Sequence, residues 1–295
     1  MKQFKLQDKK KHNYFEGYYT RVVDERQDIN YAFIFAKTLY KKDPHAFIQI
    51  FDGTSNTYLR FPLEAFDYSE SHTVTIGDNT LSPQHLTVKN KTFIIDVTFH
   101  HQTSLESKSA MGYLSHFPLQ CYQEVLYMSM DVIGTLIDGN TSVSLKAYGY
   151  MEKTYGRRFP KRWFWLQAAH FQRDTYLSMA GGSVPTLVVK PFGFFTVFMH
   201  KGTTYRFGTY NLSRIKIVRL EENKTQFIVR KKTYKLVIDA TMHHPVELLG
   251  PSDYGAMNLP VYESLSSTVH LRFYINKILV YEGKSSYAGY ENMLK

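Results

Sequence analysis

Cysteine is almost absent from this sequence, and long hydrophobic runs are missing from it. The single cysteine, Cys121, excludes an intrachain disulfide framework and is typical of a reducing compartment. A membrane-spanning helix needs roughly 18 or more apolar residues, whereas the most apolar window covers only residues 192–199. Residues 1–12 contain five lysines without an apolar segment behind them. We therefore expect neither a transmembrane span nor a secretory signal, and a cytoplasmic location.

The residues that are abundant are aromatic and basic. The chain has 295 residues, 43% of them hydrophobic, with 23 Tyr and 21 Phe but only 2 Trp. Such a composition supports a sizeable core and favours sheet over helix. The net charge of +10 comes from the second half, since residues 1–150 carry 15 basic and 16 acidic side chains and residues 151–295 carry 21 and 10. This step predicts two domains, 1–150 and 151–295.

Alternating apolar and polar residues predict many β-strands. The alternation is clearest over residues 93–99, 142–151, 234–240 and 269–275. Short turns such as Asp138-Gly139-Asn140 and Asn276-Lys277 separate the alternating segments, as in hairpins. Only residues 119–130 suggest a short helix. Because so many antiparallel strands must close or stack, we expect a mainly β fold of two packed antiparallel barrel or sandwich halves with little helix.

Both tryptophans lie in one predicted strand, after a turn around Gly156 and Pro160. Strand alternation places Trp163, Trp165 and Gln167 on the same face. Two large aromatic rings with one polar amide are a lining that apolar small-molecule sites use. The alternative, favoured by alternation alone, is that the tryptophans are ordinary core residues.

The same region carries a family resemblance. Residues 149–171, GYMEKTYGRRFPKRWFWLQAAHF, resemble the signature of the tocopherol cyclase family. Shorter segments that also resemble family elements are 14–19 (YFEGYY), 46–50 (AFIQI), 177–182 (LSMAGG) and 281–291. The resemblance implies two lipocalin-like barrel halves that share an apolar cavity, and a relationship to carotenoid hydratases. Its enzymes protonate an isoprenoid double bond and let a phenol or water capture the cation.

Three positions depart from the family pattern in a way that bears on activity. The family commonly has Glu and His in a Pro-Met-Glu-Cys-Tyr-His element, where this chain has Gln120 and Gln123. An amide cannot supply a proton as a carboxylic acid or an imidazolium can. Thr154 also replaces a common Asp. Two hypotheses therefore stay open: a cyclase or hydratase, and a carrier that binds a hydrophobic molecule without catalysis.

Glu152 is the best remaining acid, because the resemblance keeps it in place and alternation puts it on the face of Tyr150. We expect Glu152, Tyr155 and Tyr150 to be catalytic. The expected ligand-binding residues are Tyr18, Tyr122, Gln123, Trp163, Trp165 and Gln167. The alternative for Glu152 is a structural ion pair with Lys153, Arg157 or Arg158.

Other chemistries have weaker support. The adjacent pairs His100-His101 and His243-His244 would point to opposite faces of a strand, so we expect no metal site, and no motif indicates a cofactor. Two basic clusters, 157–162 and 230–232, could attract nucleic acid or an anionic membrane surface, although such clusters are usually just solvated. We expect a hydrophobic small molecule as partner, no specific nucleic acid, and at most peripheral membrane contact.

Overall fold

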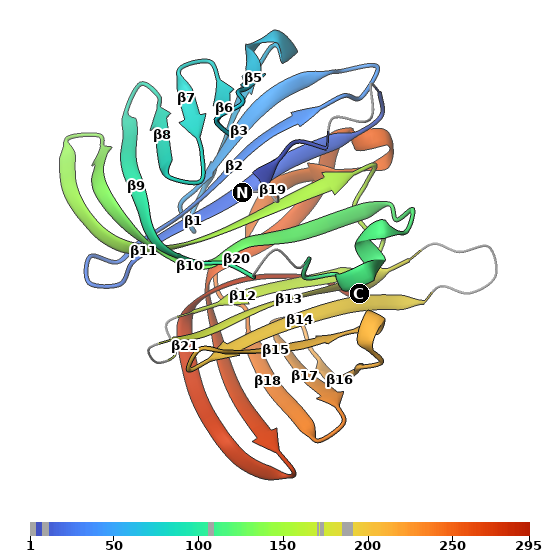
Figure 1. The fold of residues 1–295 in the computed structure, drawn as a ribbon. Helices are drawn as coiled ribbons and strands as arrows, with labels where there is room; N and C mark the ends of the chain where they lie inside the picture. Colours follow the sequence, from blue (N-terminus) through green and yellow to red (C-terminus); the bar gives the residue numbers. More distant parts are fainter. Residues whose placement is uncertain (1–3, 8–11, 106–108, 170, 172–173, 185–190) are drawn as a thin grey trace. The chain divides into compact units, whose positions relative to one another are not determined.

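The computed structural model describes residues 4–7, 12–105, 109–169, 171, 174–184 and 191–295. Within these ranges the regular structure consists of 21 strands and a few short 3-10 turns (Figure 1). The prediction of a mainly β fold with little helix is therefore confirmed. No helix in the described part of the chain is long and apolar enough to cross a membrane.

The chain divides into two compact units, which we describe separately. Unit 1 comprises Met1–Ser107, Cys121–Phe159 and Leu249–Leu259, and unit 2 comprises Lys108–Gln120, Pro160–Leu248 and Pro260–Lys295. Each unit therefore contains segments that are distant in sequence. The division into domains 1–150 and 151–295 stays a prediction.

Unit 1 contains an eleven-stranded antiparallel sheet in the order β4-β3-β2-β1-β11-β10-β9-β8-β7-β6-β5. The bounds are β1 Phe15–Asp24, β2 Ile29–Thr38, β3 His45–Phe51, β4 Asn56–Phe61, β5 Phe66–Tyr68, β6 Val74–Ile76, β7 Asn79–Leu81, β8 His85–Lys89, β9 Phe93–Thr103, β10 Cys121–Asp138 and β11 Thr141–Gly156. The sheet curls, so that β6 comes close to β3.

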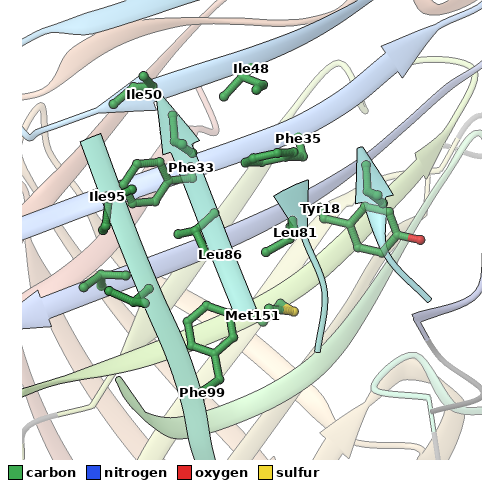
Figure 2. Packing of buried hydrophobic residues seen from close by; sticks show 14 of the residues in the cluster. Tyr18, Phe33, Phe35, Ile48, Ile50, Leu81, Leu86, Ile95, Phe99 and Met151 are labelled. Carbon is green, nitrogen blue, oxygen red and sulfur yellow. The ribbon is translucent and has the colours of Figure 1, made fainter. Parts of the chain in front are cut away.

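The core of unit 1 lies on the concave face of this curled sheet. Alternation turns Tyr18 and Val22 of β1, and Met151 of β11, toward it. Figure 2 shows the packing of these side chains with aromatic and aliphatic residues from the other strands, among them Phe33, Phe35, Ile48, Leu86, Ile95 and Phe99. Residues of the opposite parity, such as Tyr150 and Glu152, therefore project from the other face.

Unit 2 contains a second antiparallel sheet, in the order β15-β14-β13-β12-β21-β20-β18-β17-β16, with β19 paired to β20. The bounds are β12 Trp163–Ala168, β13 Thr175–Ser183, β14 Phe192–His200, β15 Thr203–Gly208, β16 Arg214–Leu220, β17 Lys224–Lys231, β18 Tyr234–Thr241, β19 Val246–Pro251, β20 Met257–Ile275 and β21 Ile278–Met293. Its core contains Phe164, Leu166 and Ala168 of β12. The two tryptophans of β12 project from the opposite face.

The short helix suggested for residues 119–130 is wrong, because most of this segment begins strand β10. The pairing of β10 with β11 shifts register between Val125 and Tyr127, and again between Tyr127 and Met130. Such bulges add residues to one strand and interrupt its period-two pattern. The apolar spacing therefore resembles a helical repeat although the backbone is extended.

Gly134 allows β10 and β9 to approach each other closely. A Cβ atom at this position would lie 2.1 Å from the Asp96 carbonyl oxygen and 2.7 Å from Val97 Cα. Both are backbone atoms of the paired strand, so they cannot move aside without disturbing the ladder.

We expect Gly134→Ala to lower the free energy of unfolding by about 2–3 kcal/mol, because the added methyl overpacks the β9–β10 pair. Gly139→Ala is the control, since Gly139 has φ +57° but nothing within 4 Å of an added Cβ. Gly139→Ala should lower the free energy of unfolding by only about 1 kcal/mol, because the left-handed backbone is the only unfavourable contribution. Urea denaturation of both variants measures the difference, and equal losses would contradict this explanation.

Candidate functional site

Glu152 lies on β11, on the face opposite the core of unit 1. Its neighbour Met151 belongs to the core, so Glu152 and Tyr150 share the other face, as the alternation predicts. Both are buried, with 5% of Glu152 and none of Tyr150 exposed. A carboxyl group in such a place needs hydrogen bonds to offset the loss of water.

The carboxylate of Glu152 accepts hydrogen bonds from two neutral side chains. The Tyr150 hydroxyl donates to Oε2 at 2.6 Å, and Gln123 Nε2 lies 2.8 Å from both carboxylate oxygens. We call Glu152, Tyr150 and Gln123 the Glu152 cluster. Gln123 comes from β10, where it pairs with Thr154 of β11 and so shares the face of Glu152.

Two of the three cations proposed as ion-pair partners of Glu152, Lys153 and Arg158, form ion pairs with other carboxylates. Lys153 Nζ lies 3.4 Å from Glu16 Oε1. Arg158 lies 2.6 Å from Asp253 Oδ1 at the end of the same unit. The position of Glu152 beside a phenol therefore has direct support, whereas a pair with Lys153 would require that side chain to cross the sheet.

Three predicted site tyrosines lie on the core side of the sheet instead. The ring of Tyr155 stacks on Tyr122, with centroids 4.9 Å apart and planes 12° apart. The Tyr155 hydroxyl donates to Glu124 Oε1 at 3.4 Å, and Tyr18 donates to the Phe4 carbonyl at 2.6 Å. A proton path from Glu152 to Tyr155 would have to cross the sheet, so Tyr150 is the phenol that the structure brings to Glu152.

A buried ion pair occupies this core side. Lys153 and Glu16 have fully buried side chains. Glu16 also accepts a hydrogen bond from the backbone N–H of Gln7 at 2.9 Å. Lys153 Nζ donates to the Lys5 carbonyl at 2.5 Å and lies 5.0 Å from the centroid of the Tyr155 ring. Burial raises the pKa of Glu16 and lowers the pKa of Lys153, and the charge of each opposes the shift of the other.

The sequence analysis did not identify this pair. Its residues lie 137 positions apart and meet through strand pairing, in which Glu16 faces Tyr155 and Tyr18 faces Lys153. A signal existed in each strand, since a charged residue occupies a position whose same-face neighbours are aromatic or apolar. Without the β1–β11 register, however, that signal does not identify a partner.

In unit 2, the tryptophan face of β12 is buried although it lies opposite the core of the unit. Trp163, Trp165 and Gln167 are 6%, 5% and 1% exposed. Trp163 Nε1 donates to Glu291 Oε2 at 2.8 Å, and Glu291 pairs with Trp165 across the β12–β21 ladder. We call Trp163, Trp165 and Gln167 the tryptophan face. Glu291 is a further carboxylate that the sequence analysis did not select.

Comparison with solved structures identifies the class of fold. CghA crystallised with Sch210972 has a TM-score of 0.64 and 10% identity, over 96% of this chain and 89% of that chain. A structure assigned to AttH from Nitrosomonas europaea has a TM-score of 0.61 and 11% identity, over 96% and 93%. Kievitone hydratase from Nectria haematococca has a TM-score of 0.54 and 11% identity, over 95% and 88%. The chain therefore has the lipocalin-like fold of these proteins.

The sequence itself identifies the family. The model described as tocopherol cyclase-like matches residues 87–292, so the chain belongs to the tocopherol cyclase-like family. The expectation from the motif in residues 149–171 is thereby confirmed. A search among curated proteins finds no significant match.

The buried ion pair predicts that removing one partner lowers the free energy of unfolding strongly and that removing the second partner as well restores most of it. Lys153→Met should lower the free energy of unfolding by about 3–5 kcal/mol, because it leaves Glu16 buried and without its cation. Lys153→Met combined with Glu16→Gln should restore most of the loss. Chemical denaturation of the two variants measures the difference, and equal stabilities would contradict the assignment of the pair.

The pH dependence of the Lys153→Met variant has a defined sign. Burial raises the pKa of Glu16, and the substitution removes the cation that lowers it, so the folded state binds a proton more readily than the unfolded chain. The stability deficit should shrink as the pH falls from neutral toward the ordinary Glu pKa of about 4.5. A deficit that stays constant over this range would show that Glu16 is not its cause.

Proposed function

We propose that this protein binds a hydrophobic, prenyl-bearing small molecule and catalyses acid-promoted cyclisation or hydration of a prenyl double bond. The observation that carries the proposal is the buried carboxyl of Glu152, held by Tyr150 and Gln123. Membership of the tocopherol cyclase-like family supports this class of reaction. The similarity to kievitone hydratase supports the fold and is consistent with hydration as one form of the activity.

In the proposed reaction Glu152 carries the proton. Its carboxyl group gives the proton to one carbon of the double bond, and the other carbon becomes a tertiary cation. Water, or the hydroxyl of a phenol in the same substrate, forms the new carbon–oxygen bond and releases a proton to the Glu152 carboxylate. Glu152 is thereby regenerated, and the burial of the site limits early capture of the cation by solvent.

Tyr150 and Gln123 position the Glu152 carboxyl. Two donors to the carboxylate hold the side chain in a defined orientation, in which both carboxylate oxygens are hydrogen-bonded. In the proton-donating half, the Gln123 amide can rotate and accept a hydrogen bond from the protonated carboxyl, which holds the acid in place until the substrate takes the proton. Tyr150 is thus a positioning residue in this proposal.

The second candidate function is a carrier for a hydrophobic ligand, and Gln123 favours it. This residue contacts Glu152 at the position where the family resemblance implies a histidine. The amide retains the hydrogen bond but cannot pass on a proton. In a carrier, Glu152 and Gln123 would recognise a polar group of the ligand without any turnover.

Glu152→Gln separates these functions. In heavy water, the wild-type protein should convert a prenylated phenol to an isomer or a hydrate with one carbon-bound deuterium. The variant should lose about 100-fold or more of the rate and still bind the substrate, because only the proton-carrying group is gone. Mass spectrometry of the product measures this. Substrate binding without deuterium uptake by the wild-type protein would establish the carrier.

The two tyrosines of β11 give a matched control for this assay. Tyr150→Phe removes the hydroxyl that donates to Glu152. Tyr148→Phe removes a tyrosine hydroxyl two residues earlier on the same face of β11. We expect a reduced rate and a shifted pH profile only in Tyr150→Phe. Equal effects of the two substitutions would argue against a specific role for the Tyr150–Glu152 bond.

Ligand binding at the tryptophan face is a separate part of the proposal. The chain contains only 2 Trp, and both lie on this face, so intrinsic tryptophan emission reports on this face alone. Titration with a prenylated phenol should change the emission, and Gln167→Leu should weaken the response by removing the polar group. Binding detected by equilibrium dialysis without any change in emission would contradict this placement.

A further inference from the structure

Two hairpins of unit 2 end side by side. The β17–β18 hairpin turns after Lys231, and the β20–β21 hairpin turns at Asn276 and Lys277. The Asn276 amide donates to the Thr233 carbonyl at 3.0 Å, which joins the two turns directly. In Figure 1 these turns are the lower ends of the orange β17–β18 hairpin and the red β20–β21 hairpin.

Three consecutive aliphatic side chains are exposed at the β20–β21 turn. Ile278, Leu279 and Val280 are 69%, 45% and 47% exposed. In a strand that covers a core, alternate side chains would be buried, as they are further along β21 at Ala288 and Tyr290. Exposed aliphatic residues on both faces of a hairpin end indicate a contact surface.

A row of positive charges crosses the adjacent strands. Arg214 of β16 pairs with Arg230 of β17, Arg230 pairs with Lys235 of β18, and Lys235 pairs with Tyr274 of β20. Like charges directly opposite each other destabilise a sheet. Lysine and arginine often protect the edge of a sheet, but only β16 is at an edge here. Lys235 Nζ lies 3.7 Å from the centroid of the Tyr274 ring, which accounts for that lysine, whereas the pairing of Arg230 with Arg214 calls for another explanation.

The acidic residues of these strands do not neutralise the row. Strands β16 and β17 contain no acidic residue, and β18 contains only Asp239, which lies further from the turn and pairs with Arg272 at 2.6 Å. Glu282 of β21 lies 2.6 Å from His270. The turns add Lys231, Lys232 and Lys277 to the basic surface.

We propose that this end of unit 2 docks onto an anionic lipid membrane. The aliphatic side chains of the β20–β21 turn enter the boundary between headgroups and acyl chains, while the surrounding lysines and arginines bind anionic headgroups. A nucleic acid would use the basic row but would leave the three aliphatic side chains without a role. None of these residues belongs to the Glu152 cluster or the tryptophan face, so the proposal is independent of the proposed function.

Vesicle co-sedimentation of the full chain tests the proposal. The protein should bind vesicles of phosphatidylcholine mixed with phosphatidylserine, bind phosphatidylcholine alone much more weakly, and dissociate at high salt. Lys232→Gln with Lys277→Gln, two exposed lysines of the two turns, should lower the partition coefficient about 30-fold. Ile278→Ser with Leu279→Ser should lower it about tenfold or more.

Two control variants make chemically similar changes in unit 1, although the aliphatic control replaces one side chain instead of two. Lys41→Gln with Lys42→Gln changes the net charge equally, and Ile133→Ser removes an aliphatic side chain that is 49% exposed. Neither should alter vesicle binding. Urea denaturation should give the same midpoint for every variant, since all the substituted side chains are exposed.

Three results would overturn the proposal: no binding to the mixed vesicles at low salt, equal loss of binding in the control variants, or binding to polyuridylate without binding to vesicles. The last result would assign the basic row to nucleic acid instead.

Discussion

The antiparallel pairing of β11 with β1 on one side and β10 on the other is the constraint on which the chemistry of unit 1 depends. It fixes which residues of β11 face the core and which face away. Lys153 therefore meets Glu16, while Glu152 meets Tyr150 and Gln123. A slip of one residue would exchange the two faces and leave both carboxylates with unsuitable neighbours.

The two buried carboxylates lie on opposite faces of the unit 1 sheet and contact different groups. Glu16 has a full counter-charge and a backbone donor, an arrangement that stabilises the fold as long as both partners remain. Glu152 accepts from a phenol and an amide, both neutral and both able to rearrange when a proton moves. The proposed function assigns the proton-carrying role to Glu152 alone.

Sequence reasoning predicted the strands, the turns, the family and the contact between Glu152 and the Tyr150 phenol, because these depend on local alternation and on a contiguous motif. It failed where pairing between distant strands decides the outcome. Bulges made the start of β10 resemble a helix, and register alone brings Lys153 to Glu16.

The buried aromatic side chains lie in two kinds of place. One part of them fills the core of each unit, as with Phe33 in unit 1 and Phe164 in unit 2. Another part, including both tryptophans, is buried on the opposite face of its sheet. Burial of large aromatic rings outside the main core of a unit is the observation that supports the proposed binding of a hydrophobic ligand.

Native mass spectrometry of the protein purified without detergent tests the central claim, that the chain binds a prenyl-bearing hydrophobic molecule, most directly. The account predicts an apolar compound bound in a one-to-one complex, or uptake of one added long-chain prenylated phenol per chain. A ligand-free protein that takes up no such compound would contradict it.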